Sequence, residues 1–138
     1  MGNIINDIIE TGKIRILIVD DHDEVRQALK DLLSFTEDIE VIGEATNGQE
    51  GLEKAAELEP DIIIIDERMP GLNGLETSRK ITESALSCKV IMITNHDDLK
   101  LEAFECGVKA YLLKGVKLEI LVDCIRRVNR GETIQSES

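Results

Sequence analysis

Acidic, hydroxyl and amine side chains follow the apolar runs of this sequence at the points where strands would end. Asp20 and Asp21 follow the first strongly apolar run, and Asp66 follows a run of four isoleucines. Thr94 ends a later run, and Lys114 ends the last one. Because ligand groups collect outside the carboxyl ends of strands in open α/β sheets, we expect these five side chains to meet at one edge of a sheet.

Such a cluster suits phosphoryl chemistry. Three carboxylates in contact repel one another unless they are protonated or neutralised by a cation. Oxygen ligands without His or Cys favour Mg²⁺, which readily shares its coordination shell with a phosphoryl oxygen. A lysine and a hydroxyl can bind the remaining phosphoryl oxygens. We therefore predict a Mg²⁺-assisted site in which Asp66, between the acidic pair and Lys114, is the nucleophile.

Each residue taken alone also has an ordinary structural explanation. Asp20 or Asp21 could cap the helix that follows, and Asp66 could open a turn. Thr94 could be a simple strand residue and Lys114 a surface lysine. The prediction therefore depends on their convergence.

Five short β-rich segments alternate with longer segments of helical period. The near-continuous Ile and Val content of the middle segments is typical of strands that are covered on both faces. Strict alternation predicts an α/β fold with one doubly wound parallel sheet of the (βα)5 type. The expected strands are residues 14–20, 40–45, 61–66, 89–94 and 109–114.

Helical periodicity is clearest after the first strand. There Val25, Ala28, Leu29, Leu32 and Leu33 form an apolar stripe at i, i+3, i+4, i+7 and i+8. The other expected helices are one that follows Asn47 with Leu52, Ala55 and Ala56 turned inward, and three over residues 73–85, 97–106 and 118–130.

Length and composition limit the classes of protein to which this chain can belong. The chain has 138 residues and a formal net charge of −12, the size of one domain with a surface unsuited to nucleic acid. Purely apolar runs reach only four residues, so no membrane span is expected, and no secretory signal is visible. Cys88, Cys106 and Cys124 form no paired spacing, which favours buried thiols of a cytoplasmic protein.

Both ends of the chain differ from the domain between them. Residues 1–12 form an N-terminal extension, in which four isoleucines (Ile4, Ile5, Ile8 and Ile9) could make an amphipathic turn or two. Residues 13–131 form the domain. Residues 132–138 are polar, and we expect a flexible tail or the start of a linker.

Three segments resemble the receiver domain of bacterial two-component response regulators. They read ILIVDDH at 16–22, PDIIIIDERMPG at 60–71 and AYLLK at 110–114. In this order and spacing they are highly specific, and the resemblance covers about residues 13–131. It implies a flavodoxin-like sheet of strand order 2-1-3-4-5. It also implies a phosphoacceptor switch rather than an enzyme, phosphorylated by a sensor histidine kinase.

The resemblance carries roles to individual positions. Asp66 matches the phosphoacceptor, and Asp20 and Asp21 match the acidic pair that holds Mg²⁺ together with it. The backbone carbonyl of Arg68 would be the remaining protein ligand of the metal. Lys114 matches the lysine that pairs with the phosphoryl group.

Further matches concern switching and the lifetime of the phosphoryl group. Thr94 matches the hydroxyl that moves toward the phosphate, and Tyr111 the aromatic side chain that follows it inward, a two-state element biased by new hydrogen bonds. Arg68 and His96 lie where side chains influence loss of the phosphoryl group.

Departures from the common pattern indicate a subgroup. Gly115 stands where many receivers have Pro, and together with His22 it resembles regulators with a LuxR-type (NarL/FixJ) DNA-binding domain. His22 itself is expected to start a helix rather than to carry phosphate. We expect transcriptional control through a DNA-binding output domain that is absent here, with a phosphorylation-dependent homodimer. The alternative is a stand-alone receiver that acts by protein–protein interaction.

Other functions fit the sequence less well. A haloacid-dehalogenase-like phosphatase would need an acid two positions after the nucleophile, where this chain has Arg68. Dinucleotide and P-loop motifs are missing. A degenerate receiver that serves only as a scaffold is disfavoured because all five site residues are chemically competent.

Overall fold

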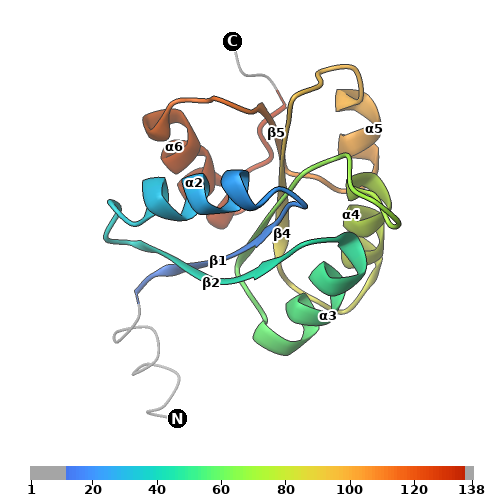
Figure 1. Cartoon of the computed structure of the whole chain (residues 1–138), viewed down its shortest axis with the longest axis horizontal. Coiled ribbons are helices and arrows are strands. Elements are labelled where there is room, and N and C mark those ends of the chain that lie inside the picture. The colour runs from blue at the N-terminus through green and yellow to red at the C-terminus, as the bar shows by residue number, and fades with distance from the viewer. Residues whose placement is uncertain (1–11, 136–138) are drawn as a thin grey trace.

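Five strands rich in Ile, Val and Leu form one parallel sheet in the computed structural model, which describes residues 12–135. The strands are β1 (Ile14–Val19), β2 (Ile39–Ala45), β3 (Ile62–Ile65), β4 (Lys89–Thr94) and β5 (Ala110–Leu113). Their order in the sheet is β2-β1-β3-β4-β5, and every neighbouring pair is parallel (Figure 1). The predicted α/β class and flavodoxin-like strand order are confirmed.

Helices cover both faces of the sheet. The helices are α2 (Asp23–Leu33), α3 (Gly48–Leu58), α4 (Gly74–Glu83), α5 (Lys100–Glu105) and α6 (Leu118–Asn129). Alternate residues of a strand point to opposite faces. Ile16 and Ile18 accordingly pack with residues of α2 and α6, whereas Leu17 and Val19 pack with residues of α3, α4 and α5. Figure 1 shows this division into two layers of helices.

Side-chain caps set where two of the helices begin. Asn47 caps α3, the helix predicted to follow it, because its side chain accepts a backbone N–H of the first turn. Asn73 and Glu76 form a reciprocal capping box at the start of α4. The helix predicted from residue 97 begins only at Lys100, and Leu99 before it makes no side-chain cap.

The predicted apolar stripes of α2 and α3 are wrong in part. Ala28 and Leu32 are exposed, and the buried face of α2 instead contains Arg26 beside Leu33. Ala56 of α3 is exposed as well. In α2 the buried face differs from the predicted stripe because the Arg26 guanidinium finds hydrogen-bond acceptors inside the domain. The spacing of apolar residues cannot predict such acceptors.

The segment after α6 contacts the domain, contrary to the predicted flexible tail. Ile134 is buried, donates its backbone N–H to the carbonyl of Lys109 at 2.7 Å, and forms a parallel bridge with Ala110 at the edge of the sheet. Glu132 pairs with Arg127. Residues 132–135 therefore form no flexible tail, while the alternative expectation, the start of a linker, stays a prediction. Residues 136–138, and the N-terminal extension apart from Gly12, lie outside the described residues.

The cysteines partly match their prediction. Cys106 and Cys124 are buried, whereas Cys88 is half-buried. Among the described helices none is long and apolar enough to cross a bilayer.

Candidate functional site

The carboxylates predicted to converge do so at the carboxyl ends of β1 and β3. Asp20 and Asp66 are 3% and 5% exposed, and Asp21 is half-buried. One ligand atom from each of these residues and from His22 lies within 4.8 Å of the others. The topology causes this, because β1 and β3 are adjacent and the Asp66 N–H donates to the carbonyl of Val19 at 3.0 Å.

Lys114 reaches the same cluster from the end of β5. Its ammonium Nζ lies 3.2 Å from Oδ2 of Asp20 and 3.5 Å from Oδ2 of Asp66. Burial and the neighbouring charge of Asp20 raise the pKa of Asp66, while Lys114 opposes that rise. The structure thus places a buried carboxylate between an acidic pair and a cation.

His22 belongs to this cluster, although its position in the sequence indicated only the start of a helix. That place is confirmed, because His22 is the residue before α2. Its side chain makes no cap, and its Nδ1 lies 3.0 Å from Oδ1 of Asp20 and 3.1 Å from Oδ1 of Asp21. The hydrogen bond to Asp20 and the two negative charges raise the pKa of the imidazole. Spacing in the sequence could not show which way the ring turns.

The donor set fits a hard divalent cation. Oδ1 of Asp21 is buried and makes no hydrogen bond, and its ion-pair contact of 3.1 Å is with Nδ1 of His22, so a metal ion would replace His22 as the partner of this oxygen. Carboxylate oxygens are the ligands that Mg²⁺ prefers in proteins. The cluster of Asp20, Asp21 and Asp66 is therefore an acidic pocket that could bind such an ion.

The loop after Asp66 packs against the start of α4, a contact that was not predicted from the sequence. The N–H of Glu67 donates to Oδ1 of Asp66 at 2.9 Å, and the carbonyl of Glu67 accepts from the N–H of Gly74 at 2.8 Å. A Cβ at Gly74 would lie 2.3 Å from the carbonyl oxygen of Asp66, so only glycine fits here. Glu67 is itself buried, and its side chain meets Arg68.

Thr94, His96 and Tyr111 form a second connected set beside the first. The N–H of His96 donates to the hydroxyl oxygen of Thr94 at 3.4 Å, and the hydroxyl of Tyr111 donates to the carbonyl of His96. Thr94 and Tyr111 are buried, and burial raises the pKa of Tyr111. The N–H of Lys114 donates to the carbonyl of Thr94 at 2.8 Å, which joins the two sets through the backbone.

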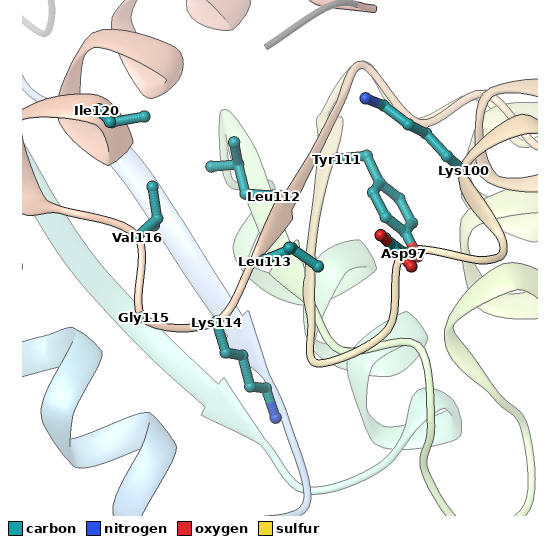
Figure 2. A pocket seen from close by; sticks show the side chains of 9 residues that line it. All are labelled: Asp97, Lys100, Tyr111, Leu112, Leu113, Lys114, Gly115, Val116 and Ile120. Atoms are coloured by element: carbon teal, nitrogen blue, oxygen red, sulfur yellow. The ribbon is translucent and has the colours of Figure 1, made fainter. Parts of the chain in front are cut away.

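A pocket of about 440 Å³ lies along β5, next to these residues. Figure 2 shows the Tyr111 ring beside Asp97 in this pocket, while Lys114 extends in another direction. The pocket is lined by Asp97, Lys100, Tyr111, Leu112, Leu113, Lys114, Gly115, Val116 and Ile120.

Arg68 stands apart from the acidic cluster. Its side chain is 59% exposed, and its Nε lies 3.3 Å from Oε1 of Glu67. Of the residues predicted for the site, the side chains of Asp20, Asp21, Asp66 and Lys114 meet in one cluster. Thr94, Tyr111 and the backbone of His96 form the second set, which is joined to the cluster through the backbone of Lys114.

Known proteins share both the sequence and the fold. The family model of the response regulator receiver domain matches residues 16–126 of the sequence, more than half of the chain. The chain is 41% identical over 125 residues to the nitrate/nitrite response regulator protein NarL of Escherichia coli strain K12, covering 89% of this chain and 58% of the relative. It is 47% identical over 120 residues to the transcriptional regulatory protein LnrK of Bacillus subtilis strain 168, covering 86% and 54%. The chain thus spans a little over half the length of these relatives.

Solved structures agree with this assignment. The signal receiver domain of the response regulator NarL from Mycobacterium tuberculosis superposes with a TM-score of 0.84 at 29% identity, over 87% of this chain and 98% of that one. A DNA-binding response regulator of the LuxR family from Staphylococcus aureus gives 0.79 at 32% identity, over 84% and 98%. With the acidic cluster and its lysine at the carboxyl edge of the sheet, these matches show that the chain belongs to the response regulator receiver domains of two-component systems, among relatives of the NarL/LuxR type.

Proposed function

We propose that Asp66 accepts a phosphoryl group from a sensor histidine kinase and that this modification switches the domain between two states. The observation that carries the proposal is the position of the Lys114 ammonium between the carboxylates of Asp20 and Asp66, at 3.2 and 3.5 Å. A cation in that place can bind a phosphoryl oxygen as soon as one arrives on Asp66.

The chemistry follows from the groups at the site. A carboxylate oxygen of Asp66 attacks phosphorus, the P–N bond of the phosphohistidine breaks, and the imidazole of the kinase leaves with the electron pair. Asp20, Asp21, Asp66 and the backbone carbonyl of Arg68 would hold Mg²⁺. When bound, this ion supplies neutralising charge for the phosphoryl oxygens. The role of the chain is to hold these donors in place and to offer Lys114 as the second cation.

The switch would run through the second connected set. A phosphoryl group on Asp66 offers new acceptors, and the hydroxyl of Thr94 is proposed to turn toward them. Tyr111 matches the aromatic side chain that follows the hydroxyl inward, but it is already buried and bound to the carbonyl of His96, so it would need no inward movement. The side chains of Arg68 and His96 are proposed to influence how fast water removes the phosphoryl group.

The output of the switch is proposed to be transcription. The relatives are named as response regulator and transcriptional regulatory proteins, and they extend well beyond the segment matched here. We assign the cytoplasm as the location, a phosphorylation-dependent homodimer as the active form, and DNA contact to an attached output domain alone. A stand-alone receiver that binds protein partners is the second candidate, supported by the open pocket along β5. Phosphatase activity is disfavoured because the Arg68 guanidinium cannot act as an acid at neutral pH.

The proposal predicts that the chain gains one phosphoryl mass when incubated with Mg²⁺ and a small phosphodonor. Intact-mass spectrometry measures the gain. Asp66→Asn should abolish it, whereas Asp123→Asn, the same change at an exposed position of α6, should leave it intact. A chelator should also abolish the gain, and added Mg²⁺ should restore it. Labelling of Asp66→Asn, or no labelling of the wild-type chain, would refute the proposal.

A further inference from the structure

Helix α2 buries a charged side chain on the face that packs against the sheet. Arg26 is only 8% exposed. The same helix leaves two apolar residues, Ala28 and Leu32, exposed to solvent. A buried charge destabilises a protein unless it is paired and hydrogen-bonded. The contacts of Arg26 therefore indicate what this residue does.

The guanidinium of Arg26 joins the acidic loop to β2. Its Nη1 donates to the backbone carbonyl of Asp20 at 2.6 Å, and its Nε donates to Oε1 of Glu44 at 3.0 Å. Its Nη2 binds the carboxylate of Asp23. Only the planar fork of an arginine can reach several acceptors at fixed angles in this way.

Glu44 is itself firmly anchored. Its Oε2 accepts from Nζ of Lys30 at 2.7 Å, and its backbone carbonyl accepts from Nζ of Lys54. The N–H of Asp20 donates to the carbonyl of Ala45, the next residue of β2, at 3.1 Å. The end of β2 thus holds both backbone groups of Asp20, the N–H by a direct hydrogen bond and the carbonyl through Arg26.

We infer that Arg26 is a positioning residue for the metal site. By fixing the carbonyl of Asp20, it sets the course of the main chain from Asp20 to Asp21 and so directs both carboxylates toward Asp66. This inference rests on the proposed function, since it assumes that the acidic cluster holds Mg²⁺. In the contacts described, Arg26 touches neither the carboxylate oxygens proposed to hold the metal nor Lys114, and it acts through the backbone carbonyl of Asp20.

An electrostatic role and a positioning role of Arg26 predict opposite effects of its substitution on Mg²⁺ binding. Loss of the Arg26 charge removes a cation near the site, so a purely electrostatic role predicts tighter Mg²⁺ binding. Loss of a positioning contact predicts weaker binding, and partners behind metal ligands typically change metal affinity by about 10–100-fold. A role in packing alone predicts lower stability with unchanged affinity of the folded chain.

The test compares Arg26→Met and Arg26→Lys with Lys30→Met in the full chain. Lys30 is a matched control because it lies on the same helix, carries the same charge and binds the same Glu44, yet does not contact Asp20. Isothermal titration calorimetry measures the dissociation constant for Mg²⁺ alone, and urea denaturation with chelator measures stability separately. Circular dichroism establishes that each variant is folded.

We expect Arg26→Met to weaken Mg²⁺ binding by about tenfold or more. Arg26→Lys should weaken it too, because an ammonium keeps the charge but loses the fork, while Lys30→Met should bind as tightly as wild type or more so. Unchanged or tighter binding by both Arg26 variants would overturn the inference and leave the proposed function standing. If Arg26→Met does not fold, the Mg²⁺ affinity of Arg26→Lys alone tests the inference. A wild-type chain that binds no Mg²⁺ would overturn both.

Discussion

Thr94 is fully buried at the end of β4, and it connects the acidic cluster to the surface. Its carbonyl accepts from the N–H of Lys114, and its hydroxyl oxygen accepts from the N–H of His96 at 3.4 Å. This bond is long and weak, so the hydroxyl would lose little by turning to donate its O–H to a phosphoryl oxygen. At the scale of the residue, the proposed switch would therefore depend on one oxygen atom.

Thr94→Ala should accept the phosphoryl group normally but fail to change partner binding or dimer formation. The reason is that Asp66 and its neighbours stay intact while the group that senses the phosphate is lost. Intact-mass spectrometry measures phosphorylation, and analytical ultracentrifugation measures association. Thr94→Ser keeps the hydroxyl and serves as the control. If Thr94→Ala associates on phosphorylation as wild type does, the switch role is wrong. Loss of the buried hydroxyl should destabilise the fold by only about 0.5–1.5 kcal/mol.

At the scale of the element, α6 is tied to the turn before β2 by one ion pair. The Nε and Nη2 atoms of Arg126 donate to the two carboxylate oxygens of Asp38, each at 2.9 Å. Hydrogen bonding to Arg126 lowers the pKa of Asp38 below its ordinary value of 3.8. A carboxylate with a lowered pKa stabilises the folded state above the pKa of the unfolded chain, and this contribution is lost as the pH falls through the folded-state pKa.

Arg126→Gln should therefore raise the pKa of Asp38 toward 3.8. The variant should be slightly less stable than wild type at neutral pH, and this difference should vanish in acid below the folded-state pKa of Asp38. An NMR titration of the Asp38 carboxyl measures the pKa, and urea denaturation at several pH values measures the stability difference. Arg127→Gln removes an ion pair with Glu132 instead and should leave the titration of Asp38 unchanged. An unshifted Asp38 in Arg126→Gln would contradict the assignment.

The elements differ in how far the sequence could predict them. The strands were predictable because uninterrupted apolar runs such as Ile62–Ile65 are typical of strands that are buried on both faces of a sheet. The convergence of Asp20, Asp66 and Lys114 followed, since parallel strands share a carboxyl edge. The burial of Arg26 was not predictable from periodicity, because it depends on a carboxylate of another element. The same applies to Ile134, whose burial depends on the free edge of β5.

At the scale of the whole molecule, exposed apolar side chains are candidates for association. Leu113 and Ile120 are 48% and 43% exposed beside the pocket along β5, Leu101 of α5 is 79% exposed, and Phe35 is 80% exposed in the turn after α2. Leu113 directly precedes Lys114, and the pocket beside it includes Tyr111 of the proposed switch (Figure 2). A change at the proposed phosphorylation site would therefore reach Leu113 through β5 itself.

Leu113→Glu should accordingly weaken phosphorylation-dependent association by about tenfold or more, as expected when a charge enters the centre of an apolar contact. Phe35→Glu is the matched control, because it places the same charge on an exposed apolar side chain in the turn after α2, away from β5, and should leave association unchanged. Both variants should still gain the phosphoryl mass, since neither side chain contacts Asp66 in the contacts described. Analytical ultracentrifugation of the phosphorylated chains compares their association. If Phe35→Glu abolishes association and Leu113→Glu does not, the surface that reads the phosphate is the turn after α2, and coupling must pass through α2 and the acidic loop rather than through β5.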